Sequence, residues 1–391
     1  LILHGGKIIP LAEEIEPVHP TAVALKDGRI LFVGDEVRVR EHQGPETEMI
    51  DLAGAVVVPG FHDSHAHLHG LGKSLATLDL MGTESPEQIS DIVRGGASRF
   101  APGAWIEGRG WDQNDWAVQE YPHRRLLDAI VPDRPVILRR VDGHAAWVNS
   151  TALAMAGITA ATADTAGGEI IRDADGEPTG ILIDNAVDLV VNVIPEPSAA
   201  EIRRRIELGV EHCLAHGVTG VHEAGIDWAK ARVYREMAES GDLGMRVYAM
   251  YGDDPETLNR AFAEGPVTAG DGRLTLRSVK LYSDGALGSR GALLQADYTD
   301  QPGHRGLTVT STEHMREVAR RAGEAGFQPC VHAIGDGANH LVLDFFEEVL
   351  GDMKLEDPRW RVEHAQILDP ADIPRFAALE VIPAMQPTHC T

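Results

Sequence analysis

Cysteine is scarce in this chain of 391 residues, which contains only Cys213, Cys330 and Cys390. The three lie far apart and form no Cys-x-x-Cys pair, so a disulfide framework is not expected and a reducing, cytoplasmic location is predicted. Long apolar runs are also missing. No run approaches ~20 residues, and no segment has the charged start and apolar middle of a signal peptide, so we expect no membrane span.

Basic residues are few, with 35 lysines and arginines against 60 acidic residues and a net charge of −25. This acidic surface repels phosphates, which disfavours nucleic acid and anionic membranes as partners. The charge leaves a small-molecule substrate open, and it leaves assembly into a homo-oligomer open as well. An apolar content of 43% is ordinary for a globular protein.

The most informative segment joins the apolar run 55–61 to His62-Asp63-Ser64-His65-Ala66-His67. The Val-rich run predicts a buried strand, and residues two apart in a strand point the same way. His65 and His67 are therefore predicted to present two imidazoles to a divalent metal at the strand's carboxyl end. Histidines on a half-buried surface are the alternative, which is disfavoured because unpaired imidazoles there would be costly to bury. Asp63 is expected to hydrogen-bond a ligand imidazole.

Lys280, His332 and His364 are further candidate ligands on predicted strands. An ammonium inside a barrel strand tends to lose its proton, and a neutral amine can react with carbon dioxide to give an anionic carbamate. The alternative is a surface lysine whose stem lies along the barrel. Either histidine alone is better explained as a core or surface residue, but four histidines at three strand ends favour metal ligation.

The string Val-Pro-Gly-Phe-x-Asp-x-His-x-His resembles the first barrel strand of the amidohydrolase superfamily, metal-dependent hydrolases on a (β/α)8 barrel. Segments 279–281, 331–333 and 362–364 follow in the family's order. The segments 110–114 and 280–285 are similar to the branch that contains N-substituted formamide deformylase.

The resemblance implies a ligand set. His65, His67 and a carbon dioxide-derived carbamate on Lys280 would hold one zinc ion, and Lys280, His332 and His364 would hold a second. A site with one metal ion is the alternative.

The resemblance and the alternation of strand-like and helix-like segments predict an α/β fold, a TIM-type barrel over residues 55–391. Residues 1–54 are predicted to begin a small β-sandwich domain, with a hairpin at Asp27-Gly28. Residues 70–200 do not fit one βα unit and are interpreted as an insertion after the first barrel strand. Seven barrel strands are found, so the eighth, with its aspartate, and the remaining sandwich strands are expected beyond Thr391.

Substrate contacts are predicted in three places. Trp111, one of four tryptophans in the insertion, would wall an apolar pocket, with core packing as an equal alternative. Asp284 and Arg290 follow the Lys280 strand and would contact substrate, although a turn with a solvated arginine is nearly as well supported. His144 matches a family segment that lines the pocket, which implies an oxyanion or substrate contact.

The sequence thus predicts a zinc-dependent hydrolase that cleaves a carbon–nitrogen bond of an amide-type substrate by metal-activated water. Hydrolysis of a carbamate, cyclic imide or ester by the same site is an alternative. A non-catalytic barrel used for binding is another, and it is disfavoured because the five ligand residues are all present.

Overall fold

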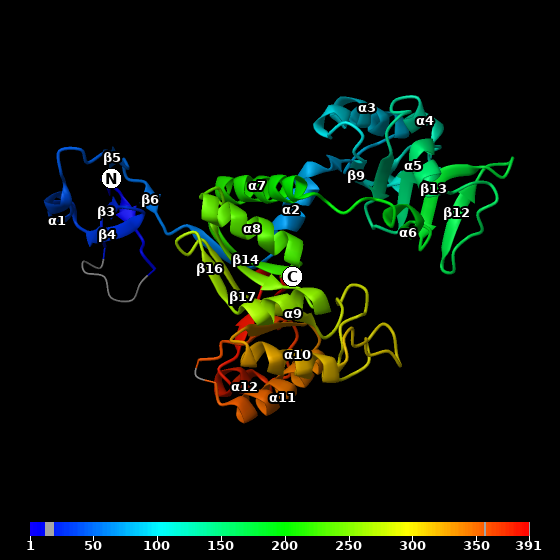
Figure 1. Cartoon of the computed structure of the whole chain (residues 1–391). Helices are drawn as coiled ribbons and strands as arrows, with labels where there is room; N and C mark the ends of the chain where they lie inside the picture. Colours follow the sequence, from blue (N-terminus) through cyan, green and yellow to red (C-terminus); the bar gives the residue numbers. More distant parts are fainter. Residues whose placement is uncertain (12–18, 356, 391) are drawn as a thin grey trace. The chain divides into compact units, whose positions relative to one another are not determined.

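The computed structural model describes residues 1–11, 19–355 and 357–390 (Figure 1). Thr391 lies outside them. The chain divides into two compact units, of which the first holds Leu1–Asp63 and His216–Gly220 and the second holds Ser64–Ala215 and Val221–Thr391. No helix within the described ranges is long and apolar enough to cross a membrane.

The first unit is built on a four-stranded sheet of order β4-β3-β1-β5. Its strands are β1 (Ile2–His4), β3 (Ala22–Lys26), β4 (Arg29–Gly34) and β5 (Met49–Asp51). The predicted hairpin at Asp27-Gly28 is present, and both residues have the positive φ, 51° and 71°, that a tight hairpin turn requires. A helix was not expected here, yet α1 (Glu36–Val39) and the 3-10 turn η1 (Arg40–His42) follow β4, because Asp35 caps the helix.

The apolar run was predicted to be the first barrel strand, and this prediction is wrong. Val56–Val57 forms β6, which pairs in parallel with β2 (Lys7–Ile8) of the first unit. Pro59 and Gly60 interrupt the extended chain, and a separate strand β7 (Phe61–Ala66) follows. The barrel strand therefore contains His65 itself.

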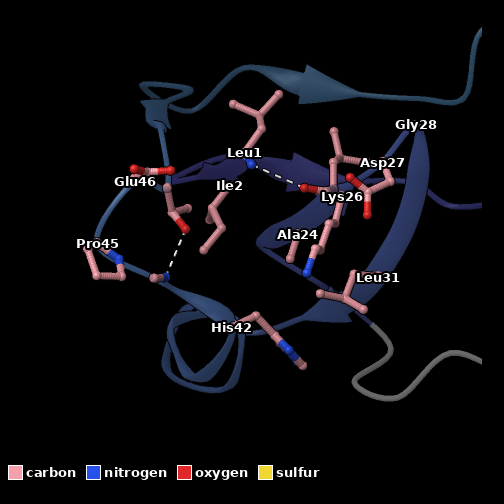
Figure 2. Close-up of a pocket in the computed structure, with 13 residues that line it drawn as sticks. Leu1, Ile2, Ala24, Lys26, Asp27, Gly28, Leu31, His42, Pro45 and Glu46 are labelled. Atoms are coloured by element: carbon pink, nitrogen blue, oxygen red, sulfur yellow. Dashed lines mark hydrogen bonds between the residues drawn. The ribbon is translucent and has the colours of Figure 1, made fainter.

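A cavity of about 980 Å³ lies beside the sheet of the first unit (Figure 2). Leu1, Ile2 and Leu31 contribute apolar surface to it, and His42 lies at its edge. None of the predicted ligands or substrate contacts lines this cavity.

The main sheet has the strand order β20-β19-β18-β17-β15-β14-β7, with β16 paired to β17. Six of the seven predicted barrel strands are present, and β7 takes the place of the predicted first one. The pairings β15–β17, β17–β18, β18–β19 and β19–β20 are parallel, and β16 pairs with β17 in the antiparallel direction. The strands after β7 are β14 (Val218–Ile226), β15 (Arg246–Tyr251), β16 (Val267–Ala269), β17 (Leu274–Tyr282), β18 (Gln328–Ala333), β19 (Arg361–His364) and β20 (Ile382–Ala384). The predicted and observed bounds of β17 agree, because its apolar residues alternate with no Gly or Pro to interrupt them.

Helices alternate with these strands, as expected for a parallel sheet. They are α7 (Ala199–Ala215), α8 (Trp228–Ser240), α9 (Pro255–Glu264), α10 (Thr312–Glu324), α11 (Asp336–Met353) and α12 (Ile373–Ala378), with η4 (Pro387–Cys390) after β20. The predicted helices at 202–216 and 313–325 correspond to α7 and α10.

The insertion contains a second sheet, of order β12-β13-β11-β10-β9-β8 (Figure 1). Its strands are β8 (Leu78–Asp79), β9 (Ile106–Trp111), β10 (Val136–Arg140), β11 (Ala145–Val148), β12 (Gly168–Arg172) and β13 (Pro178–Asp184). The helices are α3 (Pro86–Gly96), α4 (Arg125–Asp128), α5 (Ser150–Met155) and α6 (Asp188–Val191), with 3-10 turns η2 (Ala97–Arg99) and η3 (Gln113–Asp115). Two clusters of buried apolar residues pack in this region, so it has a core of its own.

Helix α2 (Leu68–Ala76) begins directly after His67 and packs closely against α7. Two glycines permit this approach. A Cβ atom on Gly72 would lie 1.6 Å from the carbonyl oxygen of Arg205, and one on Gly209 would lie 2.6 Å from that of Leu68. The α2–α7 contact therefore helps to fix the start of the helix that directly follows His67.

We expect Gly72→Ala to lower the free energy of unfolding by about 1–3 kcal/mol, because the new methyl group forces the two helices apart. Denaturant titration measures this change. Gly95→Ala is the matched control, since Gly95 lies in exposed α3 with nothing within 4 Å of its added Cβ, and it should leave stability unchanged or raise it. Equal stability of Gly72→Ala and the wild type would contradict the close packing.

Candidate metal centre

Four of the predicted ligands are histidines, and the structure brings them together at the carboxyl ends of β7, β18 and β19. The ring centroids of His65 and His364 are 4.6 Å apart, those of His332 and His364 are 4.7 Å apart, and those of His65 and His67 are 5.5 Å apart. The carboxyl ends of parallel strands are where barrel proteins gather reactive groups.

Backbone geometry contributes to this convergence. His364 has φ of 75°, a left-handed conformation that is rare for a residue with a side chain. In the β18–β19 register His364 lies opposite Ala333, while Glu363 lies opposite His332. Ordinary alternation would place His364 on the opposite face from His332, so the left-handed turn accounts for their ring contact. Such strain is typical of functional sites.

Two of the imidazoles are held in place by hydrogen bonds at Nδ1, which leaves the other ring nitrogen for a metal ion. The Nδ1 of His67 lies 3.0 Å from the carbonyl oxygen of Ala224, and that of His364 lies 2.6 Å from Oε1 of Gln386. An imidazole held in this way offers its Nε2 atom to a metal ion.

His332 differs, because its buried Nε2 has no hydrogen-bond partner and lies 3.4 Å from Oδ1 of Asp284. A buried ring nitrogen without a hydrogen bond is uncommon, and a metal ion would satisfy it. The residues present therefore fit a metal centre.

The rings are adjacent but have not closed on one point. Within the part of the chain that the structure describes, no three His, Cys, Asp or Glu side chains form a ready ligand group. A site built from the four histidines would thus require small ring movements and the lysine described next.

Lys280 is the fifth predicted ligand, and it is 1% exposed on β17. Its Nζ lies 3.6 Å from the centroid of the Tyr282 ring and donates a long hydrogen bond, 3.4 Å, to the carbonyl of Leu281. Burial lowers the pKa of Lys280 to about 8, although the charge of Glu363 opposes this shift. The amine is thus buried with few partners, and its lowered pKa leaves a minor fraction of it neutral at neutral pH.

Glu363, which was not predicted to have a role, links His65 to a buried arginine. Oε2 of Glu363 lies 2.5 Å from Nδ1 of His65, and the carboxylate accepts hydrogen bonds from Nε and Nη2 of Arg361 at 2.7 and 3.1 Å. Arg361 also donates to the carbonyl of Ser64, at 2.7 Å, and its Nη1 lies 2.6 Å from Nδ1 of His222. Strands β7, β14 and β19 are joined by these bonds.

Burial by itself would raise the pKa of the fully buried Glu363. Hydrogen bonds from His65 and Arg361, with the arginine charge, outweigh burial and lower the pKa of Glu363 to about 2. Burial is the largest cause of the lowered pKa of His364. The charges of His332, His65 and Lys280 lower this pKa further, to about 3. The carboxylate is therefore ionised and the His364 imidazole neutral at neutral pH, as metal ligation requires.

Asp284 was predicted to contact substrate, but its buried carboxylate serves the protein backbone. It accepts hydrogen bonds from the amides of Leu293, Ile334 and Gly335 at 2.9, 3.0 and 2.9 Å. These bonds tie the loop after β17 to the turn after β18, beside His332. Asp284 therefore positions the loop and has no free oxygen surface for a substrate.

The remaining predicted contacts lie elsewhere. Trp111 is fully buried in the insertion core, where its Nε1 donates to the carbonyl of Leu138 at 2.8 Å. All four insertion tryptophans are buried, so the packing interpretation applies to them. Arg290 is exposed and paired with Asp300 at 2.7 Å, and exposed His144 contacts Asp184 at 2.8 Å. The structure does not bring these three residues to the histidine cluster.

Sequence reasoning missed Glu363 and Arg361. A signal existed, because two charged residues at positions i and i+2 put opposite charges on one face of an apolar strand. Such a pair inside a sheet implies a buried ion pair.

We expect Arg361→Met to lower the free energy of unfolding by about 3–5 kcal/mol, because it leaves the Glu363 charge buried without its main partner. The double variant Arg361→Met/Glu363→Gln should recover part of that loss. Denaturant titration of metal-free protein measures both. Arg232→Met, which removes an exposed helix pair with Glu236, is the control and should change stability little. A double variant no more stable than Arg361→Met would contradict the pairing.

The amino-acid sequence of this chain is similar to those of known proteins. The amidohydrolase family matches residues 48–391 of the chain. YtcJ of Bacillus subtilis, whose name describes an amidohydrolase, is 35% identical over 99% of this chain and 72% of its own length. The N-substituted formamide deformylase of Arthrobacter pascens is 30% identical over 92% of this chain and 68% of its own length.

A solved structure agrees with the fold. The crystal structure of an uncharacterized metal-dependent hydrolase from Pyrococcus furiosus has a TM-score of 0.79 and 32% identity, and the match covers 97% of this chain and 76% of that one. The chain spans about two thirds to three quarters of the length of these three proteins. Together with the histidines at the strand ends, these matches show that the chain belongs to the amidohydrolase family.

Proposed function

We propose that this protein is a zinc-dependent hydrolase that cleaves a carbon–nitrogen bond in a small amide-type substrate. One observation carries the proposal: four imidazoles from three strand ends lie side by side near a buried lysine, in a chain of the amidohydrolase family. His65, His67, His332, His364 and Lys280 would hold one or two ions. When bound, zinc acts as a Lewis acid that acidifies water and polarises a carbonyl group.

The protein's own groups prepare the ligands. Glu363 orients His65 through Nδ1, and Arg361 keeps that carboxylate ionised. The Ala224 carbonyl and the Gln386 amide oxygen orient His67 and His364 in the same way. Such outer contacts fix the ring and the tautomer before any metal arrives.

Lys280 would serve as a ligand after carbamylation. Its neutral nitrogen attacks the carbon of carbon dioxide, a C–N bond forms, and the nitrogen loses one proton to solvent. The product is a carbamate anion with two oxygens. Burial supports this chemistry because it lowers the pKa of the amine and so raises the fraction that is neutral.

The substrate class rests on one relative. N-substituted formamide deformylase, by its name, acts on an N-substituted formamide, and this chain is 30% identical to it. Hydrolysis of a carbamate, cyclic imide or ester would use the same site and is the alternative. A non-catalytic binding role is disfavoured because the outer contacts as well as the ligand side chains are intact.

Protein purified without chelator is expected to carry one or two zinc ions per chain, and His65→Ala/His67→Ala should carry close to none, because it removes two ligands. Elemental analysis measures the content. His314→Ala/His340→Ala removes two histidines that pair with carboxylates outside the cluster and is the matched control, with metal content unchanged. Full metal content in His65→Ala/His67→Ala would place the site elsewhere.

Lys280→Met should lose metal occupancy and hydrolytic activity, since methionine has similar length but no amine to carbamylate. A short carboxylic acid such as acetate, added in solution, should restore part of both by replacing the carbamate oxygens. Lys230→Met, at an α8 lysine paired with Asp227, is the control. Wild-type occupancy in Lys280→Met would rule out the carbamate.

The reaction class is tested by incubating zinc-loaded protein with N-alkylformamides, N-acyl amines, carbamates, cyclic imides and esters. We expect release of an amine from the formamide or acyl amine, and we expect His65→Ala/His67→Ala to abolish it. Turnover confined to esters, or no turnover by metal-loaded protein, would contradict the proposed carbon–nitrogen specificity.

A further inference from the structure

A groove of about 770 Å³ lies in the second unit, along α2, β8, β9 and β10. None of the proposed metal ligands lines it. Its charged lining residues are Lys73, Asp79, Arg99, Glu107, Arg109 and Arg139. Four cations face two carboxylates, in a chain whose acidic residues outnumber its basic ones by 60 to 35. The groove is thus positively charged, although the net charge of the protein is negative.

The two carboxylates are already engaged. Glu107 lies 3.8 Å from Nζ of Lys73 and 4.0 Å from a guanidinium nitrogen of Arg205. Oδ1 of Asp79 accepts a hydrogen bond from the amide of Met81 at 3.0 Å. Asp79 also lies opposite Arg109 in the β8–β9 register, so the positive charge that no carboxylate offsets belongs to Arg99 and Arg139.

Arg109 and Arg139 are directly opposite each other on the neighbouring strands β9 and β10. Like charges opposite one another in a sheet are destabilising. Arg109 donates to the carbonyl of Val141 at 3.2 Å, and the side chain of half-buried Arg139 forms no hydrogen bond or ion pair with any described residue. A bound anion would relieve this repulsion and use both guanidinium groups.

The rest of the lining consists of apolar side chains, glycines and the two hydroxyl residues Ser74 and Thr77. Leu75, Leu78 and the exposed side chain of Met81 border the groove, and Met81 packs over Gly110, where an added Cβ would lie 2.8 Å from its Cγ. The groove therefore combines a cationic pair with an apolar wall, which suits a small organic anion with a hydrocarbon body.

We propose that this groove is a second binding site, separate from the metal centre, for a small organic anion. Arg109 and Arg139 bind its carboxylate or phosphate group, Lys73 and Arg99 add long-range attraction, and Met81 covers its apolar part. The proposal does not depend on the hydrolase activity.

Calorimetric titration with benzoate and with phenyl phosphate, at constant ionic strength, tests the site. Binding of either probe identifies the preferred oxyanion, and Arg139→Gln and Arg109→Gln should each weaken it about tenfold or more, because each removes a charge-assisted hydrogen bond. His65→Ala/His67→Ala should bind with wild-type affinity, which separates this site from anions held by a metal. Arg204→Gln, an exposed arginine of α7, is the matched control.

Thermal unfolding supplies a second readout. Without ligand, Arg139→Gln should be at least as stable as wild type, because the repulsion between the two arginines is gone, and the ligand should stabilise wild type but not the variant. Binding of neither probe would overturn the proposal. Wild-type affinity in both arginine variants would also overturn it, as would loss of binding in His65→Ala/His67→Ala alone.

Discussion

The candidate site depends on the contacts that the buried carboxylate of Glu363 makes with His65 and Arg361. The carboxylate is fully buried, it contacts His65 at 2.5 Å, and Arg361 holds it in the ionised form. An unpaired carboxylate in this position would carry a desolvation cost of several kcal/mol. Arg361 also bonds to Ser64 and His222, so the charge pair that orients the first ligand also ties three strands of the sheet together.

Register places the other ligands. Lys280, Cys330 and Arg361 are aligned across β17, β18 and β19, and Tyr282, His332 and Glu363 form the next row towards the carboxyl ends. The buried Lys280 and Arg361 thus share the first row, and the half-buried His332 and the buried Glu363 share the second. The left-handed conformation of His364 adds a fourth imidazole that strand alternation alone would have turned away.

Strand order and the histidine cluster could be predicted from sequence because they depend on local pattern: apolar runs, turn residues, and histidines at strand ends. The break between β6 and β7 was missed because Val56–Phe61 is apolar throughout, and only pairing with β2 shows that Val56–Val57 belongs to the first unit. The burial of Trp111 and the backbone hydrogen bonds accepted by Asp284 depend on contacts between distant segments. Residue type alone does not distinguish such structural roles from substrate contacts.

The most direct test of the metal centre is a crystal structure of zinc-loaded protein with anomalous data collected on both sides of the zinc absorption edge. We expect one or two anomalous peaks bonded to the imidazoles of His65, His67, His332 and His364, with a carbamate on Lys280. Glu363 should still contact Nδ1 of His65, leaving Nε2 on the metal. Zinc bound away from these side chains, or bound to His65 through Nδ1 with Glu363 displaced, would contradict this expectation.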